Sequence, residues 1–137
     1  MLDLFDAHAM QHLEPKATYE FLKDNPEAIF IDCRSEIEYF FVGHPTGAMH
    51  VAWQDGPNWA VDPQFVAQVK TAAGMNRPVV LICRSGNRSL DAGHALEAAG
   101  FTQVVNVLHG FEGELGENHH RNEKSGWRHD GLPWEQS

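Results

Sequence analysis

The sequence predicts a single α/β domain in which helices cover both faces of a parallel β-sheet. Short, continuous apolar runs at 28–31 and 79–82 are typical of strands that are buried on both faces. Stretches with helical periodicity, such as 65–73, alternate with these runs, and this alternation indicates a parallel sheet. The length of 137 residues suits one hydrophobic core. We therefore expect one domain over 1–137, with residues 1–8 as an N-terminal extension.

The first half of the chain contains the signals for three strands and two helices. Pro15 suits the first turn of a helix that runs to about Lys23, because proline is tolerated at the first helical position. Ser35 and Glu38 have the spacing of a capping box, which predicts a short second helix through about Phe41. The expected strands are 9–13 at an edge of the sheet, 28–31 and 48–53, and a turn cluster occupies 43–47.

The second half continues the alternation of helices and strands. Asp62 is the expected N-cap of a helix with Pro63 at its first position, an apolar stripe from Phe65 to Ala73, and Gly74 at its end. The expected elements after it are a strand at 79–82, a helix at 89–99 with Gly100 just beyond its end, and a strand at 104–108.

Charge and composition exclude several classes of function. The net charge of −9 disfavours nucleic acid as a partner, because phosphate binding needs clustered lysine and arginine. The N-terminal residues lack the basic and apolar regions of a signal peptide, and no apolar stretch is long enough to span a membrane. Two cysteines, Cys33 and Cys83, are too few for a disulfide scaffold. We expect a cytoplasmic protein with free thiols, and the sequence leaves its oligomeric state open.

The strongest chemical signal is the stretch Cys83-Arg84-Ser85-Gly86-Asn87-Arg88-Ser89, which follows the expected strand at 79–82 and opens a helix. Backbone N–H groups of such a loop, together with a helix N-terminus, form a concave site of positive potential. A field of this kind stabilises a thiolate and attracts anions to it. Arg84 and Arg88 strengthen the field, and each of them has a salt bridge to a nearby carboxylate as its structural alternative.

Three cysteine chemistries compete for this loop. A phosphatase loop has five residues between cysteine and arginine, whereas four separate Cys83 from Arg88, and Ile82 stands where histidine is often found. Dithiol exchange favours Cys-x-x-Cys, which is absent, although Cys33 remains a possible resolving thiol as well as a buried structural one. Sulfur transfer needs a thiolate that attacks a sulfane sulfur and then holds it as a persulfide, and the short loop suits one sulfur atom.

These residues resemble the single-domain rhodaneses, which are sulfurtransferases. The loop from Cys83 to Ser89 is similar to the active-site loop of that family, residue for residue. Asp32-x-Arg34 with Glu38 and Tyr39, followed by Gly43-His44 and Gly47-Ala48, resembles its second signature. Gly131-Leu132-Pro133, preceded by Trp127, resembles its C-terminal signature, so the resemblance covers about 9–134.

The resemblance implies a central parallel sheet of about five strands and a persulfide on Cys83, with neither metal nor organic cofactor. It implies small donors such as thiosulfate, and thiols, cyanide or protein thiols as acceptors. Asp32 and Arg34 are expected to support the loop from below, or to form a purely structural ion pair, and an Arg34–Glu38 pair at helical spacing fits either role. The expected function is sulfur transfer through Cys83. A carrier module loaded by a protein partner is the alternative, and a phosphatase or arsenate reductase is less favoured.

The chain also departs from the family pattern. Pro45 comes one position earlier than usual in its turn, and residues 111–125 form a longer connection, which we interpret as an insertion or loop. That segment either covers the active site or is a solvated loop, and we favour the second. His119 and His120 within it are a weak metal signal, because no further ligands follow at suitable spacing. Trp53 and Trp59 flank a Gly-Pro loop, and either could line the mouth of a pocket.

Overall fold

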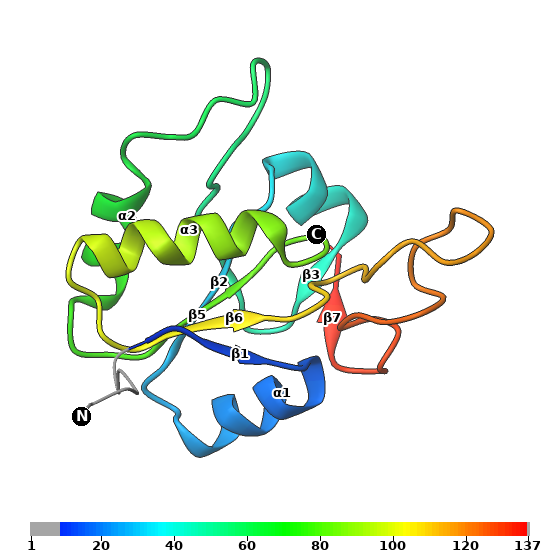
Figure 1. Cartoon of the computed structure of the whole chain (residues 1–137), viewed down its shortest axis with the longest axis horizontal. Coiled ribbons are helices and arrows are strands. Elements are labelled where there is room, and N and C mark those ends of the chain that lie inside the picture. Colours follow the sequence, from blue (N-terminus) through cyan, green and yellow to red (C-terminus); the bar gives the residue numbers. More distant parts are fainter. Residues whose placement is uncertain (1–8, 137) are drawn as a thin grey trace.

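A five-stranded, fully parallel β-sheet forms the centre of the molecule. In this computed structural model, which describes residues 9–136, the strand order is β1-β6-β5-β2-β4 (Figure 1). The strands are β1 (Gln11–Leu13), β6 (Val104–Val107), β5 (Val79–Ile82), β2 (Ile29–Asp32) and β4 (Met49–His50). Every residue of β5 and β6 is buried, as expected for central strands of a sheet that is covered on both faces.

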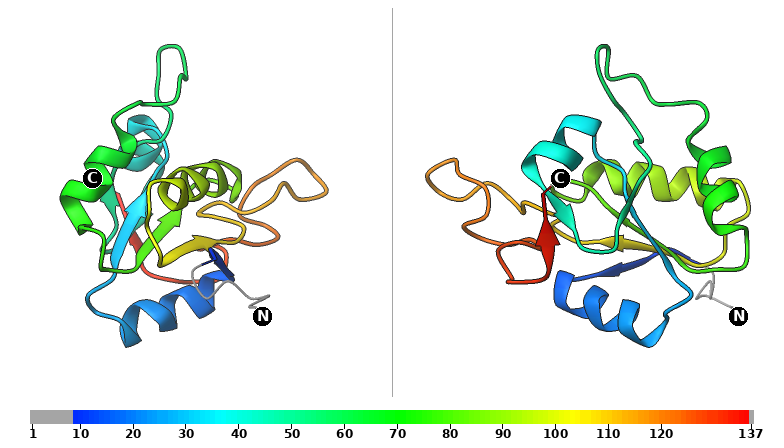
Figure 2. Two further views of the ribbon diagram at one scale, coloured as in Figure 1. Left: turned by 60° about the vertical axis from the view of Figure 1, so that its left-hand side comes forward. Right: turned by 180° about the vertical axis from the view of Figure 1, so that it is seen from behind.

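Helices cover the two faces of the sheet, as predicted. Figures 1 and 2 show α1 (Pro15–Asp24) beneath one face and α2 (Phe65–Ala73) with α3 (Asn87–Ala98) over the other. Phe65, Val69 and Leu96 pack with the side of the sheet that carries Ile31 and Leu81. On the opposite side, α1 contributes Tyr19, Phe21 and Leu22 to a second cluster that contains Phe30, Val80, Ile82 and Trp127. Because the strands are parallel, their carboxyl ends lie together at one edge of the sheet, between the two helical layers.

Three predicted boundaries need correction. The strand expected at 48–53 is regular only at Met49–His50, although the backbone N–H groups of Val51 and Trp53 still donate to Asp32 and Cys33. The helix expected from Pro63 begins at Phe65, because the Asp62 carboxylate accepts a hydrogen bond from the Gln64 N–H (2.8 Å) and holds a turn there instead. The helix expected from residue 89 begins two residues earlier, at Asn87.

The turn cluster at 43–47 contains a short strand that the sequence did not predict. This strand, β3 (His44–Pro45), pairs in antiparallel fashion with β7 (Trp134–Glu135) near the C-terminus. Between η1 (Glu38–Val42), a π-helix, and β3, Gly43 has a positive φ of 114°, and an added Cβ would lie 2.8 Å from the Trp134 ring. Trp127 is buried and its indole N–H donates to the Pro133 carbonyl (2.8 Å), so Trp127 and the β3–β7 pairing of Trp134 hold the C-terminal segment on the domain.

Residues 111–125 contain no helix or strand, and their outer part projects from the domain (Figure 1, orange). No helix within residues 9–136 is both long enough and apolar enough to cross a bilayer. Residues 1–8, expected to form an N-terminal extension, lie outside the described part of the chain.

Candidate active site

Cys83 lies directly after β5, at the carboxyl end of a central strand. This is the edge at which open α/β sheets place their ligand sites. The side chain is almost completely enclosed, with 1% of the residue exposed. Residues 83–86 form a tight loop, and Asn87, Arg88 and Ser89 are the first residues of α3. The seven residues singled out in the sequence are therefore a four-residue loop followed by the first turn of a helix.

The Cys83 sulfur is the focus of this loop. The backbone N–H of Gly86 points at Sγ from 3.1 Å, and the Ser89 hydroxyl lies 3.2 Å from it on the other side. Gly86 has a φ of 107°, a backbone conformation that residues other than glycine rarely adopt. This glycine therefore allows the turn that points its N–H at the sulfur. The N-terminus of α3 adds the positive end of a helix dipole to the same site.

Ser89 connects the sulfur to a chain of polar side chains that the sequence did not reveal. The Ser89 hydroxyl donates to Asn106 Oδ1 on β6 (2.5 Å), and Asn106 Nδ2 lies 3.3 Å from His12 Nδ1 on β1. Ser89 and Asn106 are buried, whereas His12 is exposed. The β1–β6 register places His12 opposite Asn106. The contact depends on this pairing between two distant strands, which the sequence alone does not give. The result is a hydrogen-bonded path from the candidate nucleophile to the surface.

Arg88 makes a bidentate ion pair with Glu38, at 2.7 and 2.9 Å. The Glu38 carboxylate also accepts a hydrogen bond from the Ser35 backbone N–H (3.2 Å), and the Glu38 N–H donates to the Ser35 hydroxyl (3.3 Å), so the predicted capping box is present. Burial alone would raise the pKa of Glu38, but the hydrogen bonds and charge of Arg88 outweigh burial and lower that pKa to about 2. The predicted Arg34–Glu38 pair is therefore wrong, because Arg88 is the partner of Glu38.

Arg84 differs from Arg88 in its surroundings. It is exposed and makes no ion pair with any carboxylate within residues 9–136. The backbone of Arg84, in contrast, is fixed, because its carbonyl accepts hydrogen bonds from the N–H groups of Glu112 (2.9 Å) and Gly113 (3.2 Å). Of the two loop arginines, Arg84 is the one whose charge is available to a ligand.

Asp32 and Arg34 form a fully buried ion pair at the end of β2. Arg34 Nη2 lies 2.6 Å from Asp32 Oδ2, and the same guanidinium donates to the carbonyl of Gly43. Its Cζ lies 4.4 Å from the centre of the Phe111 ring, and the Phe111 N–H donates to the Cys83 carbonyl (2.8 Å). The pair thus connects β2, the turn at Gly43 and the segment under Cys83. Neither side chain lines the clefts described below, so their contact with the loop is indirect.

Gly110 allows this supporting segment to approach the loop. A Cβ on Gly110 would lie 2.6 Å from the Arg84 carbonyl oxygen, and its φ of 62° also favours glycine. The hydrogen bonds from Phe111, Glu112 and Gly113 then hold residues 83 and 84 in place. The base of the 111–125 segment is thus part of the frame of the site, whereas residues 117–120 at its tip are exposed. The exposed tip fits the favoured interpretation of a solvated loop, whereas the bracing role of the base was not among the interpretations offered for this segment.

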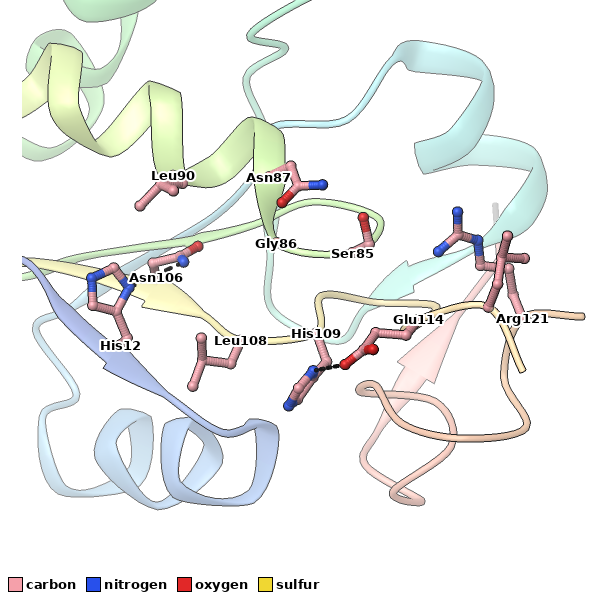
Figure 3. A pocket seen from close by; sticks show the side chains of 11 residues that line it. His12, Ser85, Gly86, Asn87, Leu90, Asn106, Leu108, His109, Glu114 and Arg121 are labelled. Atoms are coloured by element: carbon pink, nitrogen blue, oxygen red, sulfur yellow. Dashed lines mark hydrogen bonds and ion pairs between the residues drawn. The ribbon is translucent and has the colours of Figure 1, made fainter. Parts of the chain in front are cut away.

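Two clefts flank the loop. One, which we call the Arg84 cleft, has a volume of about 610 Å³ and includes Arg84, Arg88, Glu38, Ile37, Val42 and Trp59. The other, the His12 cleft, has a volume of about 660 Å³. In Figure 3, His12 and Asn106 lie side by side at one end and Arg121 lies at the other, with the His109–Glu114 ion pair between them. Of the two candidate tryptophans, Trp59 lines a cleft, whereas Trp53 packs against Phe65 in the core.

Cys33 directly follows β2, the neighbour of β5 in the sheet, and is completely buried. Its thiol donates to the Ile82 carbonyl (3.4 Å), and burial raises the pKa of this thiol well above its usual range. A thiol that is enclosed and held protonated is a poor resolving nucleophile. These contacts favour the structural interpretation of Cys33.

The part of the chain that the structure describes contains no group of three histidine, cysteine or acidic side chains arranged to hold a metal ion. His119 and His120 are exposed at the tip of the 111–125 segment, where His120 pairs with Glu123 (3.5 Å).

The sequence matches the Rhodanese-like domain over residues 14–114, which is most of the chain. The chain belongs to the rhodanese-like family. A crystal structure of Rv0390 from M. tuberculosis is similar, with a TM-score of 0.84 and 38% identity, over 94% of this chain and 98% of that one.

Two sequence relatives carry an activity in their names. The Thiosulfate sulfurtransferase 16 of Arabidopsis thaliana is 30% identical over 76% of this chain and 77% of its own length. The Thiosulfate sulfurtransferase GlpE of Pseudomonas putida is 30% identical over 74% of this chain and 82% of its own length. The rhodanese-like fold and general membership of a sulfurtransferase family are thus shown for this chain.

Proposed function

We propose that this protein is a sulfurtransferase in which Cys83 takes sulfane sulfur from thiosulfate or a persulfide donor and passes it to a thiophilic acceptor. The observation that carries the proposal is the contact of Gly86 N–H with Cys83 Sγ at 3.1 Å, at the start of a helix and in a four-residue loop. Such a loop is suited to hold one additional sulfur atom that carries negative charge.

The reaction has two half-reactions. The Cys83 thiolate attacks the outer sulfur of thiosulfate, the S–S bond of the donor breaks, and sulfite leaves with the bonding electron pair. The enzyme then carries Cys83–S–S⁻, and no proton is consumed in this step. A thiol or cyanide attacks the outer sulfur, and Cys83 returns to the thiolate.

The loop residues have separate roles in this proposal. Arg84 attracts the anionic donor, and the backbone of Ser85, Gly86 and Asn87 surrounds the persulfide. Ser89 contacts the Cys83 sulfur through its hydroxyl, 3.2 Å away. Arg88 is a positioning residue, because its guanidinium is already bound to Glu38. Asp32 and Arg34 support the frame beneath.

The same ion pair argues against phosphate ester chemistry. A phosphatase of the cysteine class uses a loop arginine to bind the equatorial oxygens of its substrate. Here Arg88 gives two of its donors to a carboxylate, and Arg88 also comes one position too early in the loop. Sulfur transfer needs no such arginine in the loop.

Steady-state kinetics test the proposal. With thiosulfate as donor and cyanide as acceptor, double-reciprocal plots are expected to be parallel, because the covalent intermediate separates the two half-reactions. The Cys83→Ser variant is expected to be inactive and Cys33→Ser active. Persulfide formation that occurs only with a protein donor, and never with small donors, would instead favour a carrier module.

A further inference from the structure

The polar chain that starts at Cys83 ends at a histidine in contact with solvent. Ser89 and Asn106 are buried, whereas His12 is exposed on β1, an edge strand of the sheet. Asn106 Nδ2 lies 3.3 Å from His12 Nδ1, and Figure 3 shows the two side chains next to each other at one end of the His12 cleft. Histidine is the side chain that ordinarily changes its charge between about pH 5 and 8. The outer end of the chain can therefore exchange a proton with water.

The hydrogens of this chain point away from the sulfur. The Ser89 hydroxyl donates to Asn106 Oδ1 (2.5 Å), and the Asn106 amide N–H faces His12 Nδ1. A ring nitrogen accepts an N–H only when it carries no hydrogen, so this arrangement requires a neutral His12 with its hydrogen on Nε2. The single hydroxyl proton of Ser89 is then used by Asn106, and Cys83 Sγ faces an oxygen lone pair. Such a partner suits a thiol and opposes a thiolate or persulfide, which needs donors.

Protonation of His12 reverses the chain. An imidazolium carries hydrogen on both ring nitrogens, so its Nδ1–H would meet the N–H of Asn106 unless that amide turned over. The turned amide accepts from His12 through Oδ1 and donates to Ser89 Oγ through Nδ2. The planar amide occupies nearly the same space in both orientations, so the strands need not move. The Ser89 hydroxyl is then free to donate to Cys83 Sγ, which lies 3.2 Å away.

Other charged groups surround His12 and Cys83, but they have partners of their own. They are His109, Glu114 and Arg121 in the cleft, Glu14 and Lys124 beside these, Glu97 with His94 on α3, and Arg88 with Glu38 near the sulfur. Glu97 accepts from the backbone N–H of Met10 (2.8 Å), and the residues that α3 adds to the cleft, Asn87 and Leu90, are uncharged. Within residues 9–136, His12 is the titratable side chain that hydrogen-bonds to Asn106.

We propose that His12 is a positioning residue for sulfur loading, which in its protonated form turns the Ser89 hydroxyl toward the Cys83 thiolate and the persulfide that follows; this rests on the proposed function of Cys83. The reaction itself is unchanged: the thiolate attacks the outer sulfur of thiosulfate, the S–S bond breaks, and sulfite leaves with the electron pair. The proton on His12 comes from solvent and stays on the imidazole.

The test is the pH profile of persulfide formation with thiosulfate, measured by rapid quench in the wild type and in His12→Gln, whose side chain does not titrate. The ratio of the wild-type rate to the variant rate cancels the titration of the thiol itself. We expect this ratio to rise by about 5-fold or more between pH 8.5 and pH 5.5, because a hydrogen bond to a charged group contributes free energy of that order. His94→Gln is the matched control, since it removes an exposed histidine of α3, and its ratio is expected to stay constant.

The Ser89→Ala background decides how His12 acts. Without the hydroxyl the chain is broken, so His12→Gln is expected to have no pH-dependent effect there. A ratio that is constant with pH would overturn the inference, and so would an equal rise in Ser89→Ala, which would mean that His12 acts through its charge alone.

Alkylation of Cys83 by iodoacetamide separates this inference from the proposed function, because it needs a thiolate but no sulfane sulfur. If thiosulfate adds no sulfur to Cys83, the proposed function fails. The same rise in the ratio of alkylation rates would still support the role of His12, and a constant alkylation ratio would contradict it.

Discussion

Arg88 and Glu38 are fifty residues apart in the chain and are joined by two hydrogen bonds, 2.7 and 2.9 Å long. The pair connects the first turn of α3 to the first residue of η1. Arg88 follows the Cys83 loop directly, so this contact fixes one end of the loop against the wall of the Arg84 cleft. It also removes Arg88 from the set of free anion-binding groups, which leaves Arg84 for that role.

The ion pair predicts a specific loss of stability in acid. Glu38 has a pKa of about 2 in the folded protein, below the value of about 4.3 for an unperturbed glutamate. A lowered pKa gives stability that is present above about pH 4.3 and is lost as the pH falls toward 2. The free energy of unfolding, measured by denaturant titration over this range, is expected to fall less steeply in Glu38→Gln than in the wild type. Glu20→Gln is the control, because the Glu20–Lys23 pair is exposed. Identical slopes for the wild type and Glu38→Gln would contradict the assignment.

Ser89 is expected to contribute to the rate of sulfur loading. Its hydroxyl is the only side-chain group within hydrogen-bond distance of Cys83 Sγ among the described residues. The one proton of this hydroxyl points to Asn106 Oδ1 and turns to the sulfur when the sulfur carries negative charge. Removing one donor from a developing anion typically lowers the rate by about 10²-fold, so we expect a loss of that order in Ser89→Ala. Rapid-quench measurement of persulfide formation checks this, with Thr71→Ala, which removes an exposed hydroxyl on α2, as control. Loading of Ser89→Ala at the wild-type rate would exclude a role for the hydroxyl.

Asn106 offers a second test of the same polar chain. In Asn106→Asp a buried carboxylate would hold the Ser89 proton and place negative charge near Cys83. We expect slower loading than in the wild type, by about 10-fold or more, because the new charge opposes a thiolate or persulfide. Rapid-quench measurement of persulfide formation checks this. Loading of Asn106→Asp at the wild-type rate would show that the chain does not reach the sulfur.

Gly110 is expected to be intolerant of substitution for two reasons that can be separated. Gly110→Ala combines a positive φ with a Cβ that meets the Arg84 carbonyl at 2.6 Å. Gly131→Ala has a positive φ of 77° but no neighbour within 4 Å, so it carries only the backbone cost of about 1–2 kcal/mol. We expect Gly110→Ala to lose about 1–3 kcal/mol more, from overpacking, and to load sulfur more slowly. Equal stability of the two variants would mean that residues 110–113 do not brace the loop.

The buried Asp32–Arg34 pair predicts a non-additive result. Arg34→Met leaves the Asp32 carboxylate without its partner in the core, which typically costs about 3–5 kcal/mol. The double variant Asp32→Leu/Arg34→Met removes both charges and is expected to be more stable than the single one. Thermal unfolding of the wild type, Asp32→Leu, Arg34→Met and the double variant checks this. A double variant that loses the sum of both single effects would argue against the ion pair.

Much of the fold could be predicted because local signals agree with the sheet. The apolar runs at 79–82 and 104–107 are central strands, the proline and capping-box helix starts at 15 and 35–38 are in place, and Gly100 ends α3 with Phe101 buried behind it. Predictions were wrong where long-range pairing decides the structure. His44–Pro45 became a strand only because Trp134–Glu135 lies beside it, and no local pattern indicates that pairing.

The same distinction applies to the site. Cys83 and its loop could be singled out because a cysteine between a buried strand and a helix is visible locally. The partner of Glu38 was misjudged, because Arg34 at helical spacing was the local candidate and Arg88 is adjacent only in three dimensions. Asn106 and His12 were missed for the same reason, since their contact depends on the register between β1 and β6.

The most direct test of the account is the intact mass of the protein after incubation with thiosulfate. We expect the mass to increase by one sulfur atom, the addition to be released by cyanide, and peptide mapping to locate it on Cys83. Cys33→Ser is expected to gain the same sulfur and Cys83→Ser to gain none. A sulfur adduct that persists in Cys83→Ser, or that maps to Cys33, would contradict the assignment of Cys83 as the nucleophile.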